Sequence, residues 1–245
     1  MVRFMIPLAC SLLLASGGVA AAEASVVSPP TIDGWRLTLP IESDSGSAKV
    51  LNPAELDPPY LTRADDGSLD FWAPTAGTTT SHSGSPRTEL IDNTGFTSGT
   101  GGTHTLAATV TVNQVPKTSK TIVLGQIHGD HDLSSDPYTL LYYTGGTVHV
   151  KVNQQNSSGS NYLDYPLLTG VGLGTTFSYT ITDQGDGTLH FTAARNGSTQ
   201  EKTAPVPSAW SGEDVRFQAG DYEQLKGDPE DGDGGKVAFS ALTAS

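Results

Sequence analysis

Gln126 and His128 are two polar residues within the apolar run at 123–128. Residues i and i+2 of a strand share a face, so an extended chain presents this amide and this imidazole together and turns Ile127 to the other side. A histidine held by a hydrogen bond at the rim of a sheet would give the same pattern. The pair also suits a site where an imidazole moves protons near neutral pH.

Arg87 and Glu89 form a second candidate pair, in the segment Ser-Pro-Arg-Thr-Glu-Leu at 85–90. They share a strand face by the same rule, and a surface ion pair is one explanation for them. The other is a guanidinium held in place by its carboxylate neighbour, so that its planar fork can take a substrate carboxylate through two hydrogen bonds.

The third candidate segment, residues 216–224, has polar or aromatic residues at alternate places around a small pair at 219–220. On a regular strand four of them share one face: Arg216, Gln218, Tyr222 and Gln224. A single tyrosine in a strand more often packs than reacts. Beside a guanidinium and an imidazole, however, its phenol is a candidate acid or base.

Taken in order, the blocks Arg-Thr-Glu-Leu, Gln-Ile-His and Phe-x-Ala-Gly-x-Tyr-x-Gln resemble the three signature blocks of polysaccharide lyase family 7, the alginate lyases. Trp-x-Leu-Thr-Leu-Pro at 35–40 and Phe-Trp-Ala-Pro at 71–74 are similar to that family's opening strands. The resemblance implies an all-β jelly roll of two antiparallel sheets, with a concave sheet forming the substrate cleft. It also implies an anionic polysaccharide as substrate and no cofactor.

The same resemblance assigns roles by position. Arg87 and Gln126 would neutralise the uronate carboxylate, His128 would be the general base, and Tyr222 the general acid or both acid and base. Glu89 would hold Arg87, and further substrate contacts would come from three residues of the third block: Arg216, Gln218 and Gln224.

The chemistry expected of such a set is β-elimination, which removes the C5 proton of a uronate and expels the C4 oxygen. That proton becomes acidic only if positive charge and hydrogen bonds stabilise the developing dianion of the carboxylate. In mannuronate or glucuronate the proton and the oxygen leave from the same side, so Tyr222 alone would suffice. In guluronate they leave from opposite sides, and both His128 and Tyr222 are needed.

Two departures from the family pattern affect the substrate. Ile91 stands where the first block usually has an arginine, and Gln218 stands where the third block usually has a lysine. Arg216, in the place of a usual tyrosine, would restore one charge on that face. A glucuronan lyase with the same mechanism therefore remains an alternative to an alginate lyase.

The elements that would position these residues are short runs rich in Val, Ile, Thr, Tyr and Phe, separated by Gly, Asn, Asp and Ser. Hairpin turns are expected at 144–147 and 183–188, and the best helical candidate is only residues 53–56. Sequential hairpins with one apolar face imply two stacked sheets. The predicted strands are 35–40, 69–73, 103–112, 121–128, 138–143, 147–152, 176–182, 188–194, 215–222 and 236–242.

The first 24 residues have the features of a secretory signal peptide: Arg3, an apolar run, and small residues before a cleavage point after Ala22 or Ala24. We expect a secreted, extracellular protein with one domain at 25–245, a monomer that does not associate with membranes. Cys10, the only cysteine, would leave with the signal peptide, so the mature chain would have no disulfide.

The chain has 13 Lys and Arg against 26 Asp and Glu, a net charge of −13, which argues against nucleic acid as a partner. An anionic substrate then needs local positive charge, for which the candidates are Arg87, Arg216, Lys117, Lys120 and Lys151. Of the two acidic segments, 130–136 and 228–233, the second lacks the spaced ligands and terminal Glu of an EF-hand loop. We expect solvated loops or lids at the rim of the cleft in both and predict no metal.

Two other classes of protein fit a jelly roll. A carbohydrate-binding module would use stacking aromatics rather than an imidazole paired with a phenol. A glycoside hydrolase would need two carboxylates facing each other, and no strand carries that pattern. A lyase is therefore the favoured interpretation.

Overall fold

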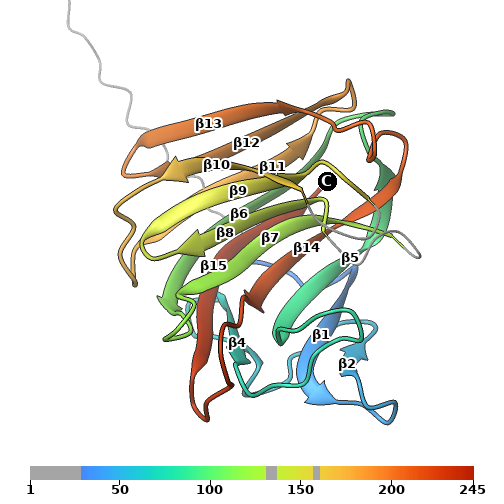
Figure 1. Cartoon of the computed structure of the whole chain (residues 1–245). Coiled ribbons are helices and arrows are strands. Elements are labelled where there is room, and N and C mark those ends of the chain that lie inside the picture. The colour runs from blue at the N-terminus through green and yellow to red at the C-terminus, as the bar shows by residue number, and fades with distance from the viewer. Residues whose placement is uncertain (1–28, 131–136, 157–160) are drawn as a thin grey trace, which may run out of the picture.

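The structure, a computed structural model, describes residues 29–130, 137–156 and 161–245, and within them it has strands and turns but no helix. The short helix expected at 53–56 is wrong, because that segment is irregular. The fifteen strands (Figure 1) are β1 (Trp35–Glu42), β2 (Ala48–Leu51), β3 (Leu61–Arg63), β4 (Leu69–Pro74), β5 (Arg87–Thr97), β6 (His104–Gln114), β7 (Thr121–Gly129), β8 (Thr139–Thr144), β9 (Thr147–Asn153), β10 (Tyr162–Leu168), β11 (Thr176–Asp183), β12 (Thr188–Arg195), β13 (Ser198–Pro205), β14 (Asp214–Glu223) and β15 (Gly234–Ala244).

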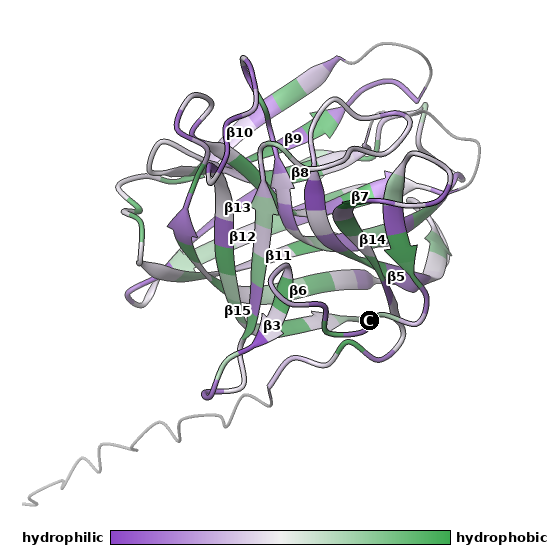
Figure 2. Ribbon diagram, turned by 90° about the horizontal axis from the view of Figure 1, so that it is seen from below, coloured by the Kyte–Doolittle hydropathy of each residue, from purple (hydrophilic) through white to green (hydrophobic). Residues whose placement is uncertain are grey.

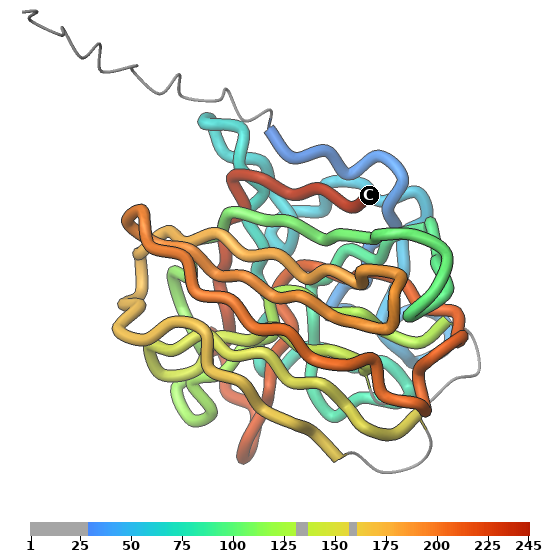
Figure 3. Tube along the Cα trace, turned by 90° about the horizontal axis from the view of Figure 1, so that it is seen from above, coloured from blue at the N-terminus to red at the C-terminus, as the bar shows by residue number. Residues whose placement is uncertain are grey.

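The strands form two antiparallel sheets that stack face to face. The eight-stranded sheet has the order β10-β9-β8-β7-β14-β5-β1-β2, and the seven-stranded sheet has the order β13-β12-β11-β6-β15-β4-β3. The outermost strands β10 and β13 contact each other where the sheets meet along one side (Figure 3). The predicted fold class, a β-jelly roll sandwich, is confirmed.

The hydrophobic core lies between the sheets and is built by alternation along each strand, which Figure 2 shows as successive green and purple bands. In β14, for example, Val215, Phe217 and Ala219 enter the core. The residues between them turn to the other face of the eight-stranded sheet. We call this outward surface the site face.

Both predicted hairpins are present, between β8 and β9 and between β11 and β12. Gly145 and Gly146 have φ angles of 53° and 91°, which glycine adopts without the steric cost that other residues have. The ten predicted strands all occur with small changes at their ends. Five strands were not among them: β2, β3, β5, β10 and β13.

The expected signal peptide and its cleavage site lie outside the described residues, as does most of the acidic segment 130–136. In the described parts of the chain, no helix is long and apolar enough to cross a membrane.

Candidate active site

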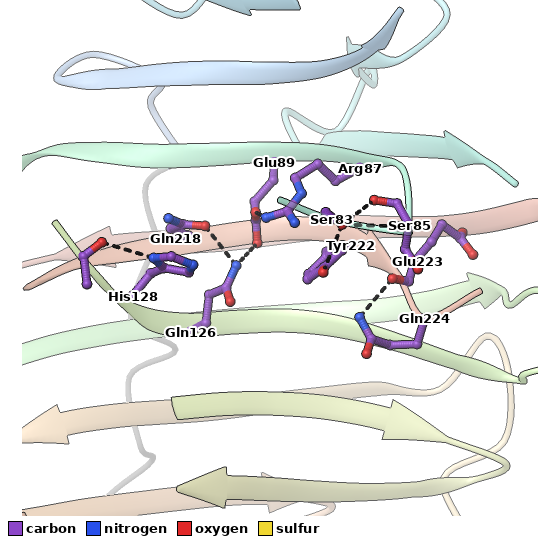
Figure 4. A network of polar contacts seen from close by, with 11 residues as sticks. Ser83, Ser85, Arg87, Glu89, Gln126, His128, Gln218, Tyr222, Glu223 and Gln224 are labelled. Carbon is purple, nitrogen blue, oxygen red and sulfur yellow. Dashed lines mark hydrogen bonds and ion pairs between the residues drawn. The ribbon is translucent and has the colours of Figure 1, made fainter. Parts of the chain in front are cut away.

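The candidate residues of the three blocks come together on the site face, on the adjacent strands β5, β14 and β7 (Figure 4). Directly paired residues of antiparallel strands share a face, and the register pairs Tyr222 with Arg87, and Gln218 with Gln126. It also pairs Arg216 with His128. Segments separated by up to 135 positions in the sequence, from Arg87 to Tyr222, are thus neighbours in the sheet.

Arg87, Glu89 and Gln126 form a buried polar chain. The Nη1 of Arg87 lies 3.0 Å from Oε2 of Glu89, and Nε2 of Gln126 donates to Oε1 of Glu89 at 2.6 Å. Complete burial raises the pKa of the Glu89 carboxyl, while the charge of Arg87 and the two hydrogen bonds oppose that rise. Glu89 therefore fixes both groups that were expected to meet the substrate carboxylate.

Gln126 is more strongly tied to the protein than its sequence suggested. Its Nε2 donates to Gln218 Oε1 at 2.8 Å as well as to Glu89, so both amide hydrogens have protein acceptors. Its Oε1 is buried and has no hydrogen-bond partner in the structure. Donation to any further acceptor would therefore require Gln126 to give up its hydrogen bond to Gln218, and its unpaired carbonyl could accept from a donor that reaches it.

Arg87 also lies over the ring of Tyr222, with its guanidinium carbon 3.6 Å from the ring centroid. The Tyr222 hydroxyl is 3.1 Å from the Ser83 hydroxyl. Gly220 permits this close packing of β14 against β5: a Cβ there would lie 2.8 Å from the Cα of Glu89 and would also meet the carbonyl of Thr88. The small residue at 220 thus lets Tyr222 stand beside Arg87.

His128 has its Nδ1 2.9 Å from the carbonyl oxygen of Gly129. A carbonyl only accepts, so this contact assigns the hydrogen of the neutral ring to Nδ1 and the lone pair to Nε2. In Figure 4 His128 and Tyr222 lie on either side of Gln126, along the direction of the strands. A sugar over Gln126 would therefore have an imidazole on one side and a phenol on the other.

Two residues expected to bind substrate, Arg216 and Gln224, instead interact with other groups of the protein. Arg216 lies on the site face but forms a buried ion pair with Asp130 at the end of β7, and its Nη1 donates to the carbonyl of Asp92 at 3.3 Å. Its charge is therefore largely compensated. Gln224 follows the last residue of β14, and its Nε2 donates to the carbonyl of Glu223 at 2.8 Å.

Sequence reasoning missed the roles of Ser83 and Asp130. Ser83 belongs to the Gly, Thr and Ser-rich segment at 77–84, which suggested no site residue, yet its hydroxyl contacts that of Tyr222. Asp130 looked like part of an acidic loop, but it neutralises Arg216. The signal for Asp130 was its place directly after the Gln-Ile-His strand, since β7 pairs with β14.

Two buried acids lie behind the site, on the face of β14 opposite Tyr222: Asp221 and Glu223. Burial and the neighbouring Asp221 raise the pKa of Glu223 to about 10, and burial raises the pKa of Asp221 as well. Neither oxygen of Glu223 has a side-chain partner. The Glu223 carboxyl is therefore a neutral acid at ordinary pH.

The acidic segment at 228–233 is partly explained by contacts with Lys117. The ammonium of Lys117 lies 3.0 Å from the carboxylate of Glu230, and the backbone N–H of Lys117 donates to the carboxylate of Asp233. Across the described parts of the chain, no three His, Cys, Asp or Glu side chains are grouped so as to hold a metal ion.

A jelly roll whose outer sheet face carries a clamped arginine, an amide, an imidazole and a phenol has the features of a polysaccharide lyase. Comparison with known proteins agrees. A sequence profile described as alginate lyase matches residues 31–245. The chain therefore belongs to the alginate lyase family and is a polysaccharide lyase.

Three solved structures illustrate the similarity. An alginate lyase from Pseudomonas aeruginosa is 28% identical over 88% of this chain and 99% of that one, with a TM-score of 0.76. An alginate lyase from Klebsiella pneumoniae is 24% identical over 86% and 95%, also at 0.76. A variant of the family 7 alginate lyase A1-II' in complex with the substrate GGMG is 24% identical over 86% and 92%, at 0.69. No curated protein matches the chain.

Proposed function

We propose that this protein cleaves alginate by β-elimination and leaves a 4,5-unsaturated uronate at the new end. The observation that carries the proposal is the Arg87–Glu89–Gln126 chain on one sheet face, in which Gln126 lies between His128 and Tyr222 and Arg87 stacks on the Tyr222 ring. A clamp for a carboxylate flanked by a base and an acid is what elimination next to a carboxylate requires.

The first step in this mechanism is binding of the uronate carboxylate. Arg87 offers positive charge. Gln126 offers an N–H donor, which exchanges its hydrogen bond to Gln218 for one to the sugar carboxylate. Because Glu89 is buried and already bonded to both groups, it keeps them from turning away when the substrate arrives. Preorganised donors of this kind stabilise the dianion that forms when the C5 proton leaves.

The second step is proton transfer. His128, with its lone pair on Nε2, takes the C5 proton of guluronate, and Tyr222 gives its proton to the departing C4 oxygen on the other side. For mannuronate, Tyr222 begins as the phenolate, takes the C5 proton and, now neutral, gives that proton to the departing C4 oxygen. The stacked guanidinium of Arg87 places positive charge beside the phenolate that exists before the uptake and after the release.

Glucuronan is a second candidate substrate, favoured by the low number of uncompensated cations near the centre. Ile91 is apolar, Gln218 is bonded to Gln126, and Arg216 is paired with Asp130. The number and placement of the carboxylates that the protein recognises beside the cleaved bond must then differ from those of the usual family pattern. Glucuronan would be cleaved by the same groups as mannuronate.

The test is to incubate the protein with polymannuronate, polyguluronate, mixed alginate and glucuronan, and to follow the ultraviolet absorbance of the unsaturated product. The proposal expects the fastest rise with an alginate polymer. A rise with glucuronan alone would show that glucuronan, not alginate, is the substrate. No rise with any of the four polymers would refute the lyase activity.

We also propose that residues 1–24 direct the protein out of the cell, on the strength of their composition. Determination of the N-terminal residue of the exported protein tests this, with Glu23 or Ser25 expected after cleavage. An intact Met1 on exported protein would contradict it.

A further inference from the structure

A continuous row of paired residues crosses the site face at right angles to the strands. Each member is directly opposite the next in the register, so all side chains share this face. The row has a cation at each end and the reaction centre in the middle. In order from β1 to β9 its members are Arg36, Ile91, Gln218, Gln126, Leu140 and Lys151.

Lys151 lies half-buried on a platform of two aromatic rings. Its ammonium is 4.7 Å from the ring centroid of Tyr142 and 6.0 Å from that of Tyr162. Its cross-strand neighbour Asp164 is occupied by the Tyr142 hydroxyl at 2.5 Å and by Nδ1 of His149 at 2.9 Å. Among the residues that the structure describes, no carboxylate forms an ion pair with Lys151, so its charge is available to an anion.

Arg36 occupies the equivalent position at the other end. Trp35 and Leu37 on either side of it enter the core, which turns Arg36 to the site face beside Ile91. It is half-buried, and the charges that act on it are those of Arg216 and Asp130, which already pair with each other. No hydrogen bond or ion pair connects the Arg36 side chain to any described residue. A guanidinium keeps its charge at every ordinary pH.

The line from His128 to Tyr222 follows the strands (Figure 4), so the sugar between them must have its neighbours to either side, across the strands. That is the direction of the row. Arg36 and Lys151 are each two strand spacings from the Gln218–Gln126 pair, about 10 Å on either side. A polyuronate carries a carboxylate on every sugar, so its flanking sugars bring carboxylates toward both ends.

We propose that Arg36 and Lys151 are carboxylate-binding subsites for the sugars on opposite sides of the cleaved bond. The inference rests on the proposed function, and it adds that the polymer runs across the strands of the sheet. Arg36 supplies, from a neighbouring strand, the cation that Ile91 does not. Lys151 adds an anion contact beside the apolar faces of two tyrosines, which suit a pyranose ring.

The experiment compares three single variants with the wild type: Arg36→Gln, Lys151→Gln and the control Lys202→Gln. Lys202 is matched to Lys151, because its ammonium also lies 4.7 Å from a tyrosine ring, that of Tyr165, but it belongs to β13 in the other sheet. Values of kcat and KM are measured with the polymer that the wild type cleaves and with uronate oligomers of increasing length.

Each site variant should raise KM for the polymer about tenfold, as the loss of one charged hydrogen bond predicts, and should change kcat much less. Their effects should multiply in the double variant, because the residues are far apart. The KM difference from the wild type should shrink on oligomers too short to reach the altered subsite. Lys202→Gln should behave like the wild type.

An unchanged KM in both site variants, with polymer cleavage intact, would overturn the subsites and leave the proposed function standing. An equal rise in the Lys202→Gln control would also overturn them. If the wild type cleaves no polyuronate, the proposed function fails. Titration of alginate oligomers into the same proteins then still decides whether Arg36 and Lys151 bind them.

Discussion

The guanidinium carbon of Arg87 lies 3.6 Å from the centroid of the Tyr222 ring, so the cation rests on the face of the ring while the hydroxyl contacts Ser83. Arg87 therefore interacts with two partners. Its Nη1 forms an ion pair with Glu89, and the plane of its guanidinium stacks on the ring of Tyr222. This arrangement separates the roles of the ring and the hydroxyl, which can be tested independently.

Tyr222→Phe keeps the stacked ring but removes the proton that elimination requires. We expect kcat to fall by at least about 10²-fold, the usual effect of losing a general acid or base, with little change in the affinity for oligomers. Ser83→Ala is the matched control, since it removes only the contact to the hydroxyl and should cost far less activity. Steady-state kinetics and oligomer titration make the comparison, and an active Tyr222→Phe variant would contradict the mechanism.

Arg87→Ala should both inactivate and destabilise the protein. It leaves the Glu89 carboxyl buried without its cation, a change that typically costs about 3–5 kcal/mol. Urea unfolding measures the loss. Adding Glu89→Gln to this variant removes the unpaired charge, and most of the stability should return without activity. If the double variant is as unstable as the single one, the ion pair is not the cause.

His128→Gln should separate the two alginate sugars. Guluronate needs a base and an acid on opposite sides, so its cleavage should fall by about 10²-fold or more. Mannuronate, for which Tyr222 performs both transfers, should lose much less. The ratio of initial rates on polyguluronate and polymannuronate measures this. Equal losses on both polymers would show that His128 is not the guluronate base.

Glu223 should make the fold sensitive to alkali. Its pKa is raised from 4.5 to about 10 by burial and by Asp221, with a smaller contribution from Asp233, so the folded state holds a proton that the unfolded chain releases. Its contribution to stability is complete below pH 4.5 and is lost as the pH rises through about 10. Glu223→Gln should weaken this decline.

Thermal unfolding across that range provides the measurement for Glu223. The exposed Glu55→Gln substitution is the control and should leave the wild-type pH dependence intact. A Glu223→Gln variant whose melting temperature declines as steeply as that of the wild type would show that another group is responsible, with Asp221 as the next to substitute.

The sequence predicted the central residues because each block is local. Alternation along one strand is enough to place Arg87 with Glu89, and Gln126 with His128. Ten of the strands and both hairpins followed from the same patterns of apolar and turn residues, with small differences at the strand ends. β13 was missed because seven of its eight residues are exposed, so it has no apolar alternation, as is typical of an edge strand.

Contacts between strands were beyond local patterns. The ion pair of Arg216 with Asp130 and the place of Arg36 beside Ile91 depend on the register of strands far apart in the chain. The double use of the Gln126 amide depends on Gln218 in the same way. These nonlocal contacts altered the expected charge of the site more than any single residue did.

The most direct test of the account is the mass of the products formed from an alginate oligomer of known length. Elimination breaks the bond without adding water, so the two product masses should sum to the mass of the substrate, and one product should carry the ultraviolet absorbance of the unsaturated uronate. Products whose masses sum to the substrate plus one water, with no such absorbance, would show hydrolysis and contradict the account.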